Sequence, residues 1–187
     1  MRRSCLSILF LVLILCLEGC PMSSRQSYRF SSYARVAESE LITASYRAAD
    51  TLLSQAEGRL SPRNPIIVAT LVNINALEES STLGRLVSEQ LGARFAQQGF
   101  RVIELKIRQT LYMKRDEGEL MLTREIENIA QQYEAQAILT GTYAESSDRL
   151  FVNLKLIQID SNIALAAVDY ALPLDVNIRT MLRRRIQ

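Results

Sequence analysis

The sequence predicts an α+β fold, a single domain in which helices pack against a mixed β-sheet of about five strands. Three observations predict this fold. Apolar residues recur at helical spacing in residues 40–55 and 80–98. An unbroken apolar run at residues 65–72 is rich in β-branched residues, which is typical of a strand covered on both faces. Three further strands, separated by short turns, follow between residues 137 and 172.

Helix and strand alternate in the first half of the predicted domain. A helix over Glu40–Gln55 is followed by a strand over Pro65–Val72. A second helix over Ser80–Gln98 ends at Gly99, and Phe100–Leu105 forms the next strand. A strand–helix–strand unit of about 40 residues predicts a parallel strand pair with a right-handed crossover.

A polar loop and a third helix are expected next. Residues Arg108–Glu119 are polar and irregular, which favours a surface loop. Thr123 is placed to cap a helix that runs to about Tyr133. Its expected buried residues are Ile126, Ile129, Ala130 and Tyr133.

An antiparallel meander and a last helix complete the predicted domain. The expected strands are Ala137–Ala144, Leu150–Leu156 and Ile163–Leu172, because turn residues separate the three runs. Asp175 is the expected N-cap of the last helix. Its two sides are expected to carry apolar residues (Val176, Met181, Leu182, Ile186) and arginines (Arg179, Arg183, Arg184, Arg185). A solvated face is the favoured interpretation of these arginines, and contact with anionic lipid or an acidic partner is the alternative.

The amino terminus has the layout of an export signal. Met1-Arg2-Arg3 is positively charged, and the apolar run Leu6–Leu17 is shorter than the roughly 20 residues that a spanning helix needs. The segment Leu17-Glu18-Gly19-Cys20 resembles the lipobox of bacterial lipoproteins, although Glu18 departs from the usual small or apolar residue. The resemblance implies cleavage before Cys20, diacylglycerol on its sulfur and an acylated amino group. An ordinary signal peptide and an uncleaved anchor are the alternatives.

This interpretation divides the chain into three parts. Residues 1–19 are the expected lipoprotein signal peptide, residues 20–37 the lipidated tether and residues 38–187 the folded domain. Several acyl chains hold a protein stably at a membrane, whereas one chain does so only marginally. Pro21 follows Cys20 in place of the Asp that marks inner-membrane retention, so we expect the periplasmic face of the outer membrane.

Composition argues against most catalytic chemistries. The chain has no histidine, which removes the commonest general base and metal ligand. Cleavage before Cys20 would remove Cys5 and Cys16, and lipid would occupy the remaining thiol. The 22 basic and 20 acidic residues nearly balance, which argues against a nucleic-acid partner. The sequence therefore predicts no catalytic residue, no cofactor and no metal site.

Two features were weighed as possible sites. Asp116, Glu117 and Glu119 lie beside Gly118 and offer carboxylates for acid–base chemistry or a divalent cation. Basic residues precede them, so a solvated loop is the favoured interpretation. Gly141 interrupts a strand, and a bulge or tight packing against a helix is favoured there over a ligand or a subunit contact.

Several short motifs carry a family resemblance. They are Tyr46 with Leu52 and Leu53, then Ile67–Asn73, Leu83–Leu86, Gly99–Glu104, Gly118–Arg124, Gly141–Tyr143 and Val152–Asn153. In this order and spacing they resemble the FlgO family of flagellar outer-membrane lipoproteins, over roughly Ala44–Pro173. The architecture is also distantly similar to the amino-terminal domain of TolB and the periplasmic domain of CsgG.

The FlgO resemblance implies a non-enzymatic, lipid-anchored outer-membrane protein that supports flagellum assembly or stability and motility. Its implied partners are outer-membrane lipid through acylated Cys20, flagellar basal-body or envelope proteins, and copies of itself. A periplasmic secretion-accessory or binding module of the TolB or CsgG kind is the alternative. Exposed strand edges and the face of the helix over Gly84–Gln98 are the candidate contact surfaces.

Overall fold

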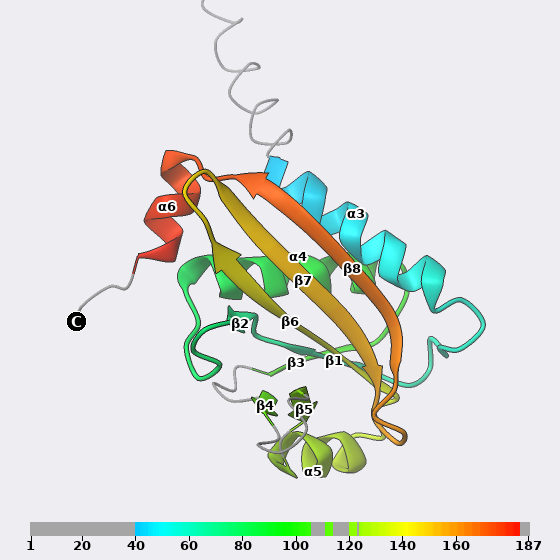
Figure 1. Ribbon diagram of the computed structural model, residues 1–187. Coiled ribbons are helices and arrows are strands. Elements are labelled where there is room, and N and C mark those ends of the chain that lie inside the picture. Colours follow the sequence, from blue (N-terminus) through cyan, green and yellow to red (C-terminus); the bar gives the residue numbers. More distant parts are fainter. Residues whose placement is uncertain (1–39, 106–110, 114–119, 123, 184–187) are drawn as a thin grey trace, which may run out of the picture. The chain divides into compact units, whose positions relative to one another are not determined.

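The computed structural model describes residues 40–105, 111–113, 120–122 and 124–183 of the 187-residue chain (Figure 1). All of these residues belong to one compact unit, Glu38–Gln187. Its described helices are α3 (Glu40–Gln55), α4 (Thr82–Gln97), α5 (Arg124–Gln132) and α6 (Val176–Leu182). Its described strands are β1 (Ile66–Ala69), β2 (Val72–Asn73), β3 (Val102–Leu105), β4 (Leu111–Met113), β5 (Leu120–Leu122), β6 (Ala137–Glu145), β7 (Arg149–Gln158) and β8 (Ala164–Pro173).

The main sheet is mixed, which confirms the predicted α+β class. Its strand order is β3-β1-β6-β7-β8, and β2 also pairs with β6. The β3, β1 and β6 strands run parallel, whereas β6, β7 and β8 form the expected antiparallel meander. The parallel β1–β3 pair is joined through α4, as the strand–helix–strand pattern predicts.

The predicted strand over Pro65–Val72 is divided in two, which gives the main sheet six strands. The break falls at Thr70–Leu71. There the Leu71 amide donates to Ser88 Oγ at 2.9 Å, and the Leu71 carbonyl accepts from Ser80 Oγ at 2.7 Å. Serine side chains in and just before α4 therefore provide the hydrogen bonds that the Leu71 backbone lacks where the chain leaves the sheet.

Helices cover both faces of the sheet. The larger core lies between the sheet and α3, α4 and α6, with Leu52, Leu91 and Ile178 among its buried residues. The smaller core joins Ile126 and Ala130 of α5 to the opposite face. Figure 1 shows α3 running alongside β8, and α5 near the bottom of the view. None of the helices in the described ranges has the length and apolarity needed to cross a bilayer.

Gly141 is required by tight packing. A Cβ built on it would lie 2.5 Å from the Asn153 carbonyl oxygen and 2.8 Å from Leu154 Cδ2. No side chain fits there without moving the neighbouring strand. Tight packing is therefore confirmed at Gly141, but the close neighbours lie on β7 and at Leu71 and not on a helix as predicted.

The expectation of a loop over Arg108–Glu119 is wrong in part. Leu111–Met113 forms β4 and pairs antiparallel with β5. A three-residue strand is too short to show a period-two pattern, and its partner β5 lies between the expected loop and the expected helix cap at Thr123. The acidic residues Asp116, Glu117 and Glu119 lie outside the described residues.

Two predicted core residues are exposed instead. Tyr133 is 52% exposed, because α5 ends at Gln132 and Tyr133 lies beyond its inward face. Val176 is 80% exposed, because it is the first residue of α6 and Ile178 is the residue buried. Ile186, Arg184 and Arg185 of the expected last helix lie outside the described residues.

Candidate interaction surface

The outer edge of β8 carries backbone groups that pair with no other strand. Its first part is covered, because the Ala167 amide donates to Gln55 Oε1 at 3.0 Å and the Leu165 carbonyl accepts from Arg59 at 2.6 Å. Backbone groups of an antiparallel strand alternate in direction, so those of Asp169 and Ala171 point to the same outer side. Within the described residues, no protein group pairs with them.

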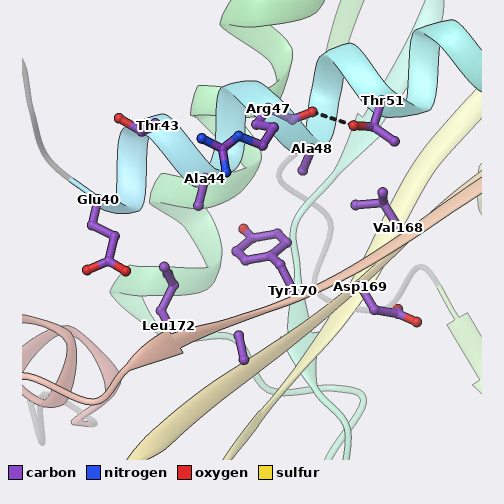
Figure 2. Close-up of a pocket in the computed structure, with 11 residues that line it drawn as sticks. Glu40, Thr43, Ala44, Arg47, Ala48, Thr51, Val168, Asp169, Tyr170 and Leu172 are labelled. Atoms are coloured by element: carbon purple, nitrogen blue, oxygen red, sulfur yellow. Dashed lines mark hydrogen bonds between the residues drawn. The ribbon is translucent and has the colours of Figure 1, made fainter.

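A groove of about 570 Å³ runs along this edge, between α3 and β8. Figure 2 shows Tyr170 between the helix and the strand, with Ala44 and Ala48 on the facing side of α3. Arg47 and Asp169 add opposite charges to the lining. A free strand edge beside an open groove is the geometry by which extended segments of partner proteins add to a sheet.

Tyr170 gives the groove a buried phenol. Its hydroxyl is buried and has no hydrogen-bond partner of good geometry among the described residues. Burial raises the pKa of Tyr170 to about 12, and the neighbouring Ser45 hydroxyl opposes this rise only in part. Ser45 itself donates to the Leu41 carbonyl at 2.8 Å, so its own proton is already used within α3.

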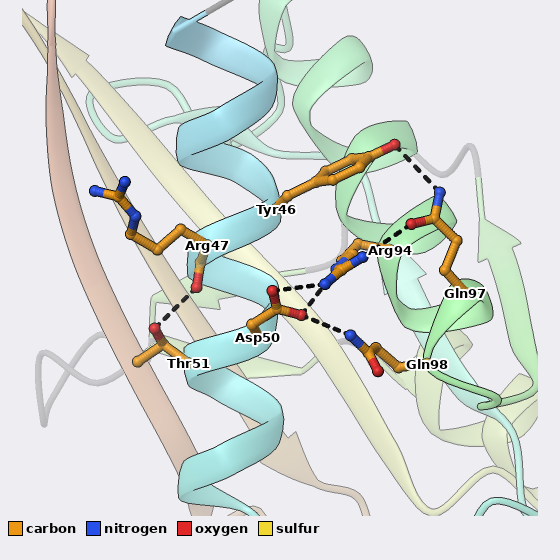
Figure 3. Close-up of polar contacts among 7 residues, drawn as sticks. All are labelled: Tyr46, Arg47, Asp50, Thr51, Arg94, Gln97 and Gln98. Carbon is orange, nitrogen blue, oxygen red and sulfur yellow. Dashed lines mark hydrogen bonds and ion pairs between the residues drawn. The ribbon is translucent and has the colours of Figure 1, made fainter. Parts of the chain in front are cut away.

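A polar cluster fixes α3 against α4 and so sets one wall of the groove (Figure 3). Arg94 of α4 donates two hydrogen bonds to the Asp50 carboxylate, at 2.8 and 2.9 Å, and Gln98 adds a third at 3.0 Å. The Arg94 guanidinium also lies 5.5 Å from the centre of the Tyr46 ring. The hydrogen bond from Arg94 holds the pKa of Asp50 below its usual value. Because both partners are partly exposed, we expect the pair to orient α3 more than to stabilise it.

Comparison with known families decides the family to which this chain belongs. The family model described as "FlgO protein" matches residues 46–177, which is more than half of the chain. The chain belongs to the FlgO family. The resemblance carried by the sequence motifs is thereby confirmed, and membership of the FlgO family supports a lipoprotein of the bacterial envelope.

A solved structure shares the fold of this FlgO-family chain, and others are similar to it at lower TM-scores. The C-terminal domain of LpoB from Salmonella enterica superposes with a TM-score of 0.50 at 15% identity, covering 72% of this chain and 98% of that one. The same domain from Escherichia coli gives 0.48 at 14% identity over 72% and 98%. The PelC dodecamer from Paraburkholderia phytofirmans gives 0.44 at 12% identity over 61% and 74%. Among curated proteins, no sequence matches this chain significantly.

None of the predicted site residues that the structure describes lines the groove. Cys20 lies outside the described residues, as do the acidic loop residues. Arg179 donates to the Ser147 carbonyl at 2.7 Å and to the Leu174 carbonyl at 3.1 Å, so it links α6 to the β6–β7 turn. Within the ranges that the structure describes, three or more metal-binding side chains do not gather at any point.

Sequence reasoning expected exposed strand edges to be contact surfaces but did not find this one. Strand order decides which edge is free, and that order depends on pairings between distant segments. The signal that was available is Pro173, since proline is confined to edges and ends of sheets. It lies at the last position of β8.

Proposed function

We propose that this FlgO-family protein is lipid-anchored at the periplasmic face of the outer membrane and supports flagellum assembly or stability, and hence motility, without enzymatic activity. The match to the FlgO family over residues 46–177 carries the proposal. The lipobox-like segment that ends at Cys20 supports the anchor. The balanced charge and the absence of histidine from the sequence support a role in binding.

The proposed mechanism is assembly by tethering. Acyl chains on Cys20 would concentrate the domain at one membrane face, where contacts that are weak singly become effective together. The free edge of β8 is the proposed contact surface, because pairing to the Asp169 and Ala171 backbone gives affinity and the groove beside α3 gives selectivity. The proposed partners are flagellar basal-body or envelope proteins, or further copies of this chain.

A swimming assay tests both the flagellar role and the lipid anchor at Cys20. Deletion of the gene should shrink swimming zones in soft agar while growth in liquid medium stays normal. The wild-type gene should restore swimming, whereas Cys20→Ala should not, because the protein would lose its membrane attachment. Cys16→Ala is the matched control and should restore swimming fully, since that cysteine lies within the expected signal peptide.

Three results would count against the proposal. Normal swimming and intact filaments in the deletion strain would remove the flagellar role. An envelope defect with unaffected motility would instead favour a secretion-accessory or binding module of the TolB or CsgG kind. Full rescue by Cys20→Ala would show that the anchor is not needed.

A further inference from the structure

A small polar cavity lies on the face of the sheet opposite α3 and α4. It encloses about 140 Å³ and is separate from the groove at β8. Asn162 adds to its polar lining, which otherwise comes from Thr140 and Thr142 of β6 and from Asn153 and Lys155 of β7. In β6 the two threonines alternate with residues of the larger core, and successive side chains of a strand point to opposite faces.

Strand register brings these four side chains into two adjacent rows. Thr140 pairs directly with Lys155, and Thr142 pairs directly with Asn153. Directly opposed side chains of antiparallel strands have their Cβ atoms about 4.5–5.5 Å apart. A single small group in the cavity would therefore be within reach of both rows.

Two hydrogen-bond donors in the first row have no partner. Thr140 is only 3% exposed, and its Oγ1 is buried without a hydrogen bond in the described part of the chain. Buried polar atoms of folded proteins are nearly always paired, so an orphaned hydroxyl facing a cavity calls for an explanation. The ammonium group of Lys155 likewise takes part in no ion pair or hydrogen bond within that part.

An acidic residue of β8, Asp169, is paired with Asn153 at the end of the second row. Asn153 Nδ2 donates to Asp169 Oδ1 at 2.7 Å, which holds that carboxylate on the β8 side of the second row. Lys155 is an exposed residue, and no ion pair joins it to an acidic side chain within the described residues. An ammonium and a hydroxyl that both donate into one cavity are the donor set that recognises an oxyanion.

We propose that this cavity binds a carboxylate or phosphate group, with Lys155 pairing with its charge and Thr140 donating a hydrogen bond to one oxygen. The volume fits so small a group, because one water occupies roughly 30 Å³ and drug-sized ligands need at least about 300 Å³. The oxyanion has two possible sources, a free small molecule or an acidic side chain of a docked protein. The proposal does not depend on the lipid anchor or on a flagellar role.

Methyl and amide NMR of the mature, full-length protein in detergent micelles tests the site. Inorganic phosphate, or the side-chain mimic N-acetyl-glutamate methylamide, should shift the Thr140 and Thr142 signals saturably, with a dissociation constant of order 1 mM. Sodium chloride at equal ionic strength should leave these signals in place. Preferential binding of phosphate would indicate a free anion, and preferential binding of the glutamate mimic would indicate an acidic side chain of a partner.

Three variants assign the binding to the named groups. Lys155→Gln and the nearly isosteric Thr140→Val should each weaken binding about tenfold or more, because a charge-assisted hydrogen bond is lost. Arg149→Gln, at an exposed cation on the same strand, is the matched control and should bind as wild type does. Phosphate or the mimic should raise the melting temperature of the wild type but not that of Thr140→Val. No saturable shift with either compound up to about 50 mM, or unchanged binding by Lys155→Gln, would overturn the proposal.

Discussion

At the scale of single residues, Tyr170 of the groove at β8 makes the stability of the fold depend on pH. Its pKa is about 12 in the fold against 10.0 for a free tyrosine, because burial penalises the phenolate. A raised pKa in the folded state stabilises the fold fully below pH 10 and loses that contribution as the pH rises towards 12. The free energy of unfolding of the wild type should fall between about pH 8 and pH 11. That of the Tyr170→Phe variant should fall by about 1 kcal/mol less over the same range.

Urea denaturation at the two pH values measures this difference. Tyr133→Phe is the matched control, since it removes a tyrosine hydroxyl from a side chain that is 52% exposed. Tyr143, whose pKa burial also raises, stays in both proteins and contributes equally. Equal alkaline losses in wild type and Tyr170→Phe would show that the phenol of Tyr170 ionises as easily in the fold as in water.

At the scale of elements, two glycines of α4 allow the effect of tight packing on stability to be distinguished from the effect of helix propensity. A Cβ on Gly84 would lie 2.4 Å from the Leu71 carbonyl oxygen, whereas on Gly92 its nearest contact would be the flexible Glu104 side chain at 3.4 Å. Gly84→Ala should therefore destabilise the fold by about 1–3 kcal/mol, because the helix must move away from β1 and β2. Gly92→Ala should be neutral or stabilise by up to about 1 kcal/mol, since alanine favours the helix.

Thermal unfolding of the two variants decides this point. The melting temperature should fall for Gly84→Ala and should hold or rise for Gly92→Ala. Equal losses at both positions would mean that α4 does not approach the break between β1 and β2 as closely as the structure shows.

Elements with local signals were predicted well from the sequence. The periodicity of Glu40–Gln55 located α3, and Asp175 was correctly expected as the N-cap of α6, where its carboxylate accepts from the Ile178 amide at 2.7 Å. The break at Thr70–Leu71 and the β4–β5 pairing were missed. Both depend on partners distant in sequence or on strands too short to show a period.

At the scale of the whole molecule, the family and the fold agree with the sequence, while the contact surfaces came from the structure. The FlgO motifs are distributed over the helices and strands of a single domain, so their order reflects the fold that the family shares. The groove beside β8 joins segments that no local pattern connects, and the cavity lined by Lys155 depends on the exact register of the predicted meander. Two separate surfaces suit the assembly role that we propose for the domain at a membrane.

Intact-mass and peptide mass spectrometry of the protein extracted from its native membranes tests the central claim, acylation of Cys20. The account predicts a mature chain that begins at Cys20 and carries diacylglycerol on the sulfur and a fatty acid on the amino group. A chain that begins beyond Cys20, or that retains this cysteine as a free thiol, would contradict the lipid-anchored assembly role proposed for this FlgO-family protein.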